Sequence, residues 1–115
     1  MSGSTTDYLH HIADEAAYLA EQSATVTRDE FMGDPTLQRA FARSVEVIGG
    51  ATKKLPRAWR DAHPEIDWRA MAGMRDRLIH GYFGVDYEIV WDVATRKADA
   101  LRRDVERLIR NEPRR

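Results

Sequence analysis

One stretch of the chain, residues 86–108, indicates how the protein folds: DYEIVWDVATRKADALRRDVERL. Asp86 is a residue type that favours the N-terminal cap of a helix. Behind it, apolar residues repeat at alternating spacings of four and three: Ala94, Ala98, Leu101, Val105 and Leu108. Such a heptad-like seam suits near-parallel packing against another helix. The stretch therefore predicts a long final helix that packs lengthwise in a bundle or in a dimer.

Three earlier segments carry apolar residues at the same helical spacing. They predict helices over residues 6–22, over residues 35 to about 54, and over residues 68 to about 80. The stripe of the first helix is Leu9, Ile12, Ala13, Ala16, Leu19 and Ala20, and the second carries Leu37, Phe41, Ser44, Val45 and Ile48. No segment has the alternating pattern that would predict a strand. We expect an all-α, antiparallel four-to-five-helix bundle that forms a single domain over residues 1–115 and dimerises.

Short sequence signals mark the ends of these helices. Thr27 and Glu30 have the capping-box spacing and open a short helical turn, while Asp34 and Pro35 suit the cap and first position of the second helix. One further helical turn is expected around Trp59 in the connection over residues 57–66.

Bulk composition narrows the class of protein. The chain has 115 residues, 43% of them apolar and 32% charged, which is typical of a globular domain. It has no cysteine, which excludes disulfides, thiolate metal ligands and a cysteine nucleophile. We expect no membrane-spanning segment and no export signal, and hence a cytoplasmic location.

The charge is unevenly distributed although the net charge is only −1. Residues 1–50 carry 3 basic and 8 acidic side chains, and residues 51–115 carry 15 basic and 11 acidic ones. Most of the basic surplus lies beyond Arg96. A solvated helix face laced with salt bridges is the favoured interpretation of this run, ahead of an RNA-tracking surface.

The candidate site is the sequence Arg75-Asp76-Arg77-Leu78-Ile79-His80-Gly81-Tyr82. Histidine is the residue type whose unperturbed pKa lies near neutral pH, so His80 is the best general acid/base candidate, and Arg75 offers a planar cation that fits phosphate oxygens. We place His80 in the last turn of the third helix with Gly81 as the residue that ends it, so that Asp76 lies four residues before His80 on one helix face and can orient the imidazole. From spacing alone, an ordinary helix-capping histidine beside a surface ion pair is favoured over a catalytic site.

If His80 and Arg75 act on the phosphodiester bonds of RNA, the reaction requires more than one proton-transfer group. Cleavage of RNA through its 2′-hydroxyl needs one group to remove a proton and another to donate one to the leaving oxygen. A single His80 does not easily do both at once, whereas two chains packed about a two-fold axis near this helix end would supply two histidines and two arginines. The mechanism therefore predicts a dimer with its active site between the subunits.

The residues Arg75, His80 and Tyr82 match the motif R-x4-H-x-Y, and in this respect the chain resembles the HepT-like branch of the HEPN superfamily. The resemblance covers about residues 28–110 and includes the flanking sequences Val47-Ile48-Gly49, Lys54-Leu55-Pro56, His63-Pro64-Glu65-Ile66 and Val85-Asp86. The chain departs from the family pattern at two places, with Asp76 where asparagine is frequent and Gly50 where glutamate is frequent.

The resemblance implies an all-α dimer that acts as a metal-independent RNase toxin on mRNA or tRNA, without a cofactor. It implies a partner antitoxin, a minimal nucleotidyltransferase that transfers AMP to Tyr82 and thereby blocks the RNA site. In this scheme Arg75 binds the scissile phosphate, His80 is the general acid/base and Asp76 orients the cluster. The alternative is a non-catalytic regulatory subunit that docks the nucleotidyltransferase, and a purely structural helical dimer is the third possibility.

Other candidates carry less weight. His10, His11 and His63 lack the spacing of a metal-ligand pair. Trp68 and Trp91 are assigned to the core, whereas the role of Trp59, core or base-stacking, stays open.

Overall fold

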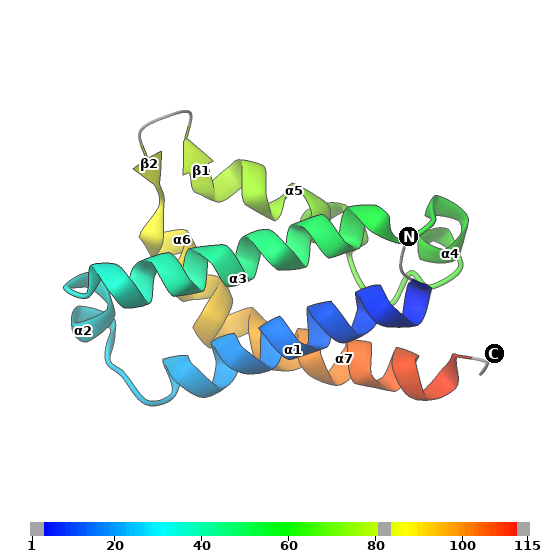
Figure 1. The fold of residues 1–115 in the computed structure, drawn as a ribbon, viewed down its shortest axis with the longest axis horizontal. Helices are drawn as coiled ribbons and strands as arrows, with labels where there is room; N and C mark the ends of the chain where they lie inside the picture. The colour runs from blue at the N-terminus through cyan, green and yellow to red at the C-terminus, as the bar shows by residue number, and fades with distance from the viewer. Residues whose placement is uncertain (1–3, 81–83, 113–115) are drawn as a thin grey trace.

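Four long helices form an antiparallel bundle in the computed structural model, which describes residues 4–80 and 84–112 (Figure 1). The long helices are α1 (Thr5–Ser23), α3 (Pro35–Lys54), α5 (Trp68–Leu78) and α7 (Ala98–Asn111). Shorter ones connect them: α2 (Arg28–Met32), α4 (Arg57–Asp61), α6 (Tyr87–Asp92) and the π-helical segment η1 (Val93–Lys97). The predicted all-α bundle is confirmed.

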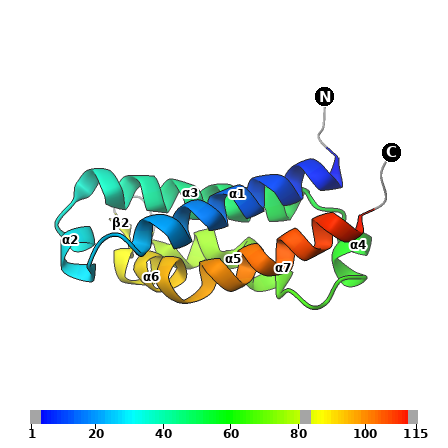
Figure 2. The same cartoon turned by 90° about the horizontal axis from the view of Figure 1, so that it is seen from below.

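α1 lies at the centre of the packing and contacts both α7 and α3, while α3 contacts α5 on its other side. Figure 2 shows α1 and α3 in one layer and α5, α6 and α7 in the other. The predicted seam of the final helix, Ala94 to Leu108, is buried inside the chain, with Val105 wholly inaccessible and Leu101 9% exposed. The seam therefore packs inside the helical bundle of a single chain.

An aromatic cluster packs the short helices α2 and α6 against the long helices. The ring of Phe31 in α2 lies 4.9 Å from that of Phe41 in α3 and 5.1 Å from that of Trp91 in α6. Tyr18 of α1 meets Phe41 edge to face at 5.8 Å. Four elements that are separate in the sequence thus share one apolar centre, to which aromatic rings contribute large buried areas.

The predicted helix starts are present. Thr27 and Glu30 form the capping box of α2, and Asp34 accepts a hydrogen bond from the backbone N–H of Leu37 at 3.1 Å. Asp86 accepts from Glu88 and Ile89 at the start of α6. These caps form because a short polar side chain reaches N–H groups that the helix itself cannot pair.

Three predictions of local structure are wrong. First, α5 ends at Leu78, two residues before His80. Second, the chain does contain strands, because β1 (Ile79–His80) pairs antiparallel with β2 (Gly84–Val85) in the register Ile79 with Val85. The backbone N–H of Asp86 binds the carbonyl of Leu78 at 2.6 Å, so the returning chain takes the carbonyl at the helix end.

Third, the final helix is interrupted by η1 rather than continuing as one α-helix. Buried Ser23 on α1 donates its hydroxyl to the carbonyl of Ala94, at 3.2 Å, and Thr95 donates to the carbonyl of Trp91, at 2.8 Å. These side-chain bonds support a segment in which the regular α-helical pattern is lost.

Two of the tryptophans pack as predicted. Trp68 is buried and donates its indole N–H to the carbonyl of His63, at 2.7 Å, and Trp91 is partly buried against the core. Trp59 stacks on the ring of His63 with centroids 4.1 Å apart and donates its indole N–H to Glu112, at 3.2 Å. One face of the Trp59 ring is thus already covered by a side chain of the protein. Among the described residues, no helix is long and apolar enough to cross a membrane.

Candidate active site

The close approach of α3 and α5 places Arg75. Gly49 on α3 is buried, and a Cβ added there would lie 3.5 Å from the backbone oxygen of Met71 and 3.8 Å from the Cβ of Arg75. A methyl group at this position would make ordinary van der Waals contact with α5, whereas a side chain larger than that of alanine would press on it. The helical part of the candidate motif, which begins at Arg75, thus lies against the middle of α3.

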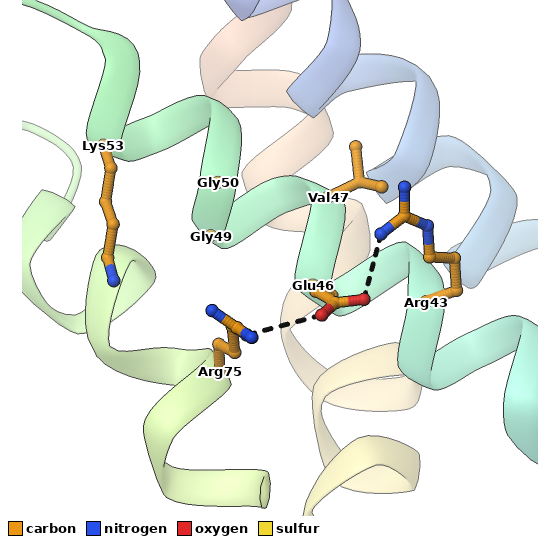
Figure 3. A pocket seen from close by; sticks show the side chains of 7 residues that line it. All are labelled: Arg43, Glu46, Val47, Gly49, Gly50, Lys53 and Arg75. Atoms are coloured by element: carbon orange, nitrogen blue, oxygen red, sulfur yellow. Dashed lines mark hydrogen bonds and ion pairs between the residues drawn. The ribbon is translucent and has the colours of Figure 1, made fainter.

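A row of ion pairs crosses from one helix to the other (Figure 3). The Nε atom of Arg75 lies 3.4 Å from one carboxylate oxygen of Glu46, and a terminal nitrogen of Arg43 lies 3.0 Å from the other oxygen. The Arg75 side chain is 52% exposed and that of Glu46 is 33% exposed. Pairs this accessible to water add at most about 1 kcal/mol to stability. Their main effect is to orient the Arg75 guanidinium, whose terminal nitrogens have no partner among the described residues.

A shallow pocket of about 370 Å³ opens beside this row. It is lined by Arg43, Glu46, Val47, Gly49, Gly50, Lys53 and Arg75. Figure 3 shows Lys53 reaching from α3 towards the space beside Arg75, with the two glycines between Lys53 and Glu46. Three cations and one carboxylate face the same hollow, which gives it a local surplus of positive charge.

The other predicted site residues are placed differently. Asp76 is exposed on α5, and His80 contributes its backbone to β1 rather than to a helix. The predicted helical i,i+4 neighbourhood of Asp76 and His80 is therefore absent. Gly81 and Tyr82 lie outside the described residues.

Three residues of the pocket were not predicted from the sequence, namely Arg43, Glu46 and Lys53. They come from the middle of α3, where the sequence interpretation used the apolar stripe and the family-like stretches but none of these charged residues. Their spacing of three and seven along one helix places them along one side. Nothing local connects them with Arg75, because that connection depends on which face of α3 receives α5.

The basic residues of the final helix are not part of this site. Arg102 lies 2.8 Å from Asp99 and 2.9 Å from Glu106, and Arg103 lies 2.6 Å from Asp99. The hydrogen bond from Arg102 lowers the pKa of the Asp99 carboxyl below its usual value. The interpretation of this run as a salt-bridged helix face is confirmed for these residues.

Fold and site together define a small helical protein with an arginine-lined, positively charged pocket on one face of its bundle. Comparison with known proteins identifies the family. A family model described as ribonuclease HepT-like matches residues 12–108. The chain belongs to this ribonuclease family.

Individual relatives agree. The chain is 42% identical over 105 residues to "Putative RNase TTE0752" of Caldanaerobacter subterraneus subsp. tengcongensis, a match that covers 91% of this chain and 94% of that protein. It is 39% identical over 108 residues to "Probable ribonuclease HepT" of Thermococcus cleftensis, covering 94% of this chain and 98% of the relative. No solved structure gives a significant match.

Proposed function

We propose that the chain is a metal-independent endoribonuclease that acts as the toxin of a toxin–antitoxin pair. The observation that carries the proposal is Arg75, which lines a positively charged pocket with its guanidinium oriented by Glu46, five residues before His80 in a ribonuclease family. Arginine pairs readily with phosphate oxygens because its planar fork donates two parallel hydrogen bonds. Arg75 binds the scissile phosphate and stabilises the charge that develops on it.

His80 supplies the proton transfers. One imidazole removes the proton of the 2′-hydroxyl, the 2′-oxygen bonds to phosphorus, and the bond from phosphorus to the 5′-oxygen breaks. A second imidazole donates a proton to that leaving oxygen, so the products are a 2′,3′-cyclic phosphate and a 5′-hydroxyl end. The two imidazoles come from His80 of two subunits of a homodimer, whose active site is the cleft between them. Asp76 stands next to Arg75 and adjusts the charge of the cluster.

This chemistry has a direct test. The purified chain, incubated with a single-stranded mRNA transcript or with tRNA in the presence of a metal chelator, is expected to cut the RNA. The fragments should carry 5′-hydroxyl ends, which polynucleotide kinase labels without prior phosphatase treatment. Intact RNA, fragments with 5′-phosphates, or cleavage that the chelator abolishes would each contradict the proposed reaction.

A minimal nucleotidyltransferase is the proposed antitoxin, and Tyr82 is its target. Transfer of AMP to Tyr82 places a bulky phosphate diester two residues from His80, where its negative charge competes with the RNA phosphate for Arg75. The proposed toxin acts in the cytoplasm, where its RNA substrates are.

The modification is tested by the intact mass of the chain after incubation with the nucleotidyltransferase encoded beside it and ATP. We expect a gain of one or more AMP units and loss of RNA cleavage, and neither change in a Tyr82→Phe variant. AMP units that map to another residue, or a modified chain that cleaves RNA at the original rate, would refute the role of Tyr82.

A further inference from the structure

The pocket beside Arg75 carries more positive charge than the contact with one scissile phosphate requires. Glu46 is shared between Arg43 and Arg75, so one carboxylate balances two guanidinium groups. Lys53 lines the same pocket and has no ion-pair partner within residues 4–80 and 84–112. Three cations against a single carboxylate leave an unbalanced surplus at this place on the bundle.

The surplus contrasts with the final helix, which has more arginines. On α7, Arg102, Arg103 and Arg107 are each paired with a carboxylate three or four residues away. Such pairs largely cancel the field of the cations at a distance. An incoming polyanion is therefore attracted to the α3 face rather than to α7, although the sequence concentrates its arginines on α7.

The floor of the pocket is open. Gly50 is exposed on α3, and a Cβ added there would meet no atom within 4 Å. A ligand can therefore come close to the helix backbone between Lys53 and Arg43. These two residues are ten positions apart on α3, which corresponds to about 15 Å along the helix axis. That distance is long enough for more than one phosphate of an extended strand.

The geometry points to a second phosphate-binding site in this pocket, which holds the RNA backbone next to the scissile phosphate through Lys53, with Arg43 as a further contact. This inference rests on the proposed action on RNA and adds residues that the R-x4-H-x-Y motif does not contain. Lys53 and Arg43 bind substrate here, whereas Arg75 acts at the reacting phosphate. Gly50 keeps the path between them free of side-chain bulk and of negative charge.

Binding of an RNA analogue that cannot be cleaved tests the site separately from catalysis. The probe is a fluorescently labelled, fully 2′-O-methylated oligouridylate, which lacks the nucleophilic hydroxyl, and its Kd is measured by anisotropy at several salt concentrations. The logarithm of the binding constant falls linearly with the logarithm of the salt concentration, and loss of one phosphate contact makes this slope less steep by about 0.7 for a single strand. We expect this reduction, with a severalfold higher Kd, for Lys53→Gln.

The neighbouring lysine provides a matched control. Lys54 is also exposed at the end of α3 but does not line the pocket. Lys54→Gln removes the same charge from the same helix turn and is expected to leave the slope unchanged. A second pair of variants tests charge at constant size: Gly50→Glu should bind the probe severalfold more weakly than Gly50→Gln, and the difference should shrink at high salt.

Equal Kd values and equal slopes for Lys53→Gln and Lys54→Gln would overturn the inference, and so would a wild-type chain that does not bind the probe. The proposed ribonuclease activity fails in a different way. If the wild type binds the probe with the predicted dependence on Lys53 but leaves natural RNA intact, the phosphate site stands and the catalytic proposal is wrong.

Discussion

Replacing His80 with alanine is expected to lower the rate of RNA cleavage at least about a hundredfold, because general acid–base catalysis contributes on the order of 10²–10⁴ to such reactions. In the proposed homodimer the substitution removes both imidazoles of the proposed cleft at once, which leaves neither His80 to take the 2′-hydroxyl proton. Arg75 remains, so binding of the uncleavable 2′-O-methyl probe should change little. The measurement is the single-turnover cleavage rate of a labelled RNA, together with growth arrest on expression in cells.

His10→Ala is the matched control, since it removes an exposed imidazole from α1. It should cleave RNA at the wild-type rate. A His80→Ala variant that still cuts RNA and arrests growth would show that His80 is not the catalytic base. The chain would then fit the alternative of a regulatory subunit that docks a nucleotidyltransferase without cleaving RNA.

Phe41→Ala is expected to reduce the free energy of unfolding by about 3–5 kcal/mol, the usual cost of truncating a buried phenylalanine. The Phe41 side chain is inaccessible to solvent and contacts the rings of Phe31 and Tyr18. Its removal therefore leaves a cavity where α1, α2 and α3 meet. Because domains of this size are stable by only about 5–15 kcal/mol, a large share of the total is lost.

Denaturant unfolding followed by circular dichroism measures this change. Arg39→Ala, at an exposed position two residues earlier on α3, should stay within about 0.5 kcal/mol of the wild type. A loss below about 1 kcal/mol for Phe41→Ala would mean that the aromatic cluster does not hold the bundle together.

Local sequence patterns were sufficient to predict where most helices begin and which faces they bury. Thr27, Asp34 and Asp86 cap helices through hydrogen bonds to residues two or three positions away, so the whole interaction is contained in a few consecutive letters. Apolar spacing likewise predicted the buried seam that ends at Leu108. The family followed from Arg75, His80 and Tyr82 and their surroundings, because the motif is a fixed spacing along the chain.

How the chain presents the motif depends on contacts between different segments, which local patterns do not contain. The end of α5 at Leu78 depends on a hydrogen bond from Asp86, and the strand pairing around His80 depends on the return of the chain through Gly84 and Val85. The π-helical segment is supported by Ser23, which is far away in sequence. Helical periodicity carries no information about such contacts.

The pocket around Arg75 likewise depends on contacts between helices that are distant in the sequence. Glu46, Arg43 and Lys53 became part of the site only because α5 packs against that face of α3, beside Gly49. Local sequence sets the conformation of each helix through bonds to near neighbours, but the choice of facing helices is made by long-range packing. A site that combines Arg75 with residues of α3 is therefore visible only once the bundle is assembled.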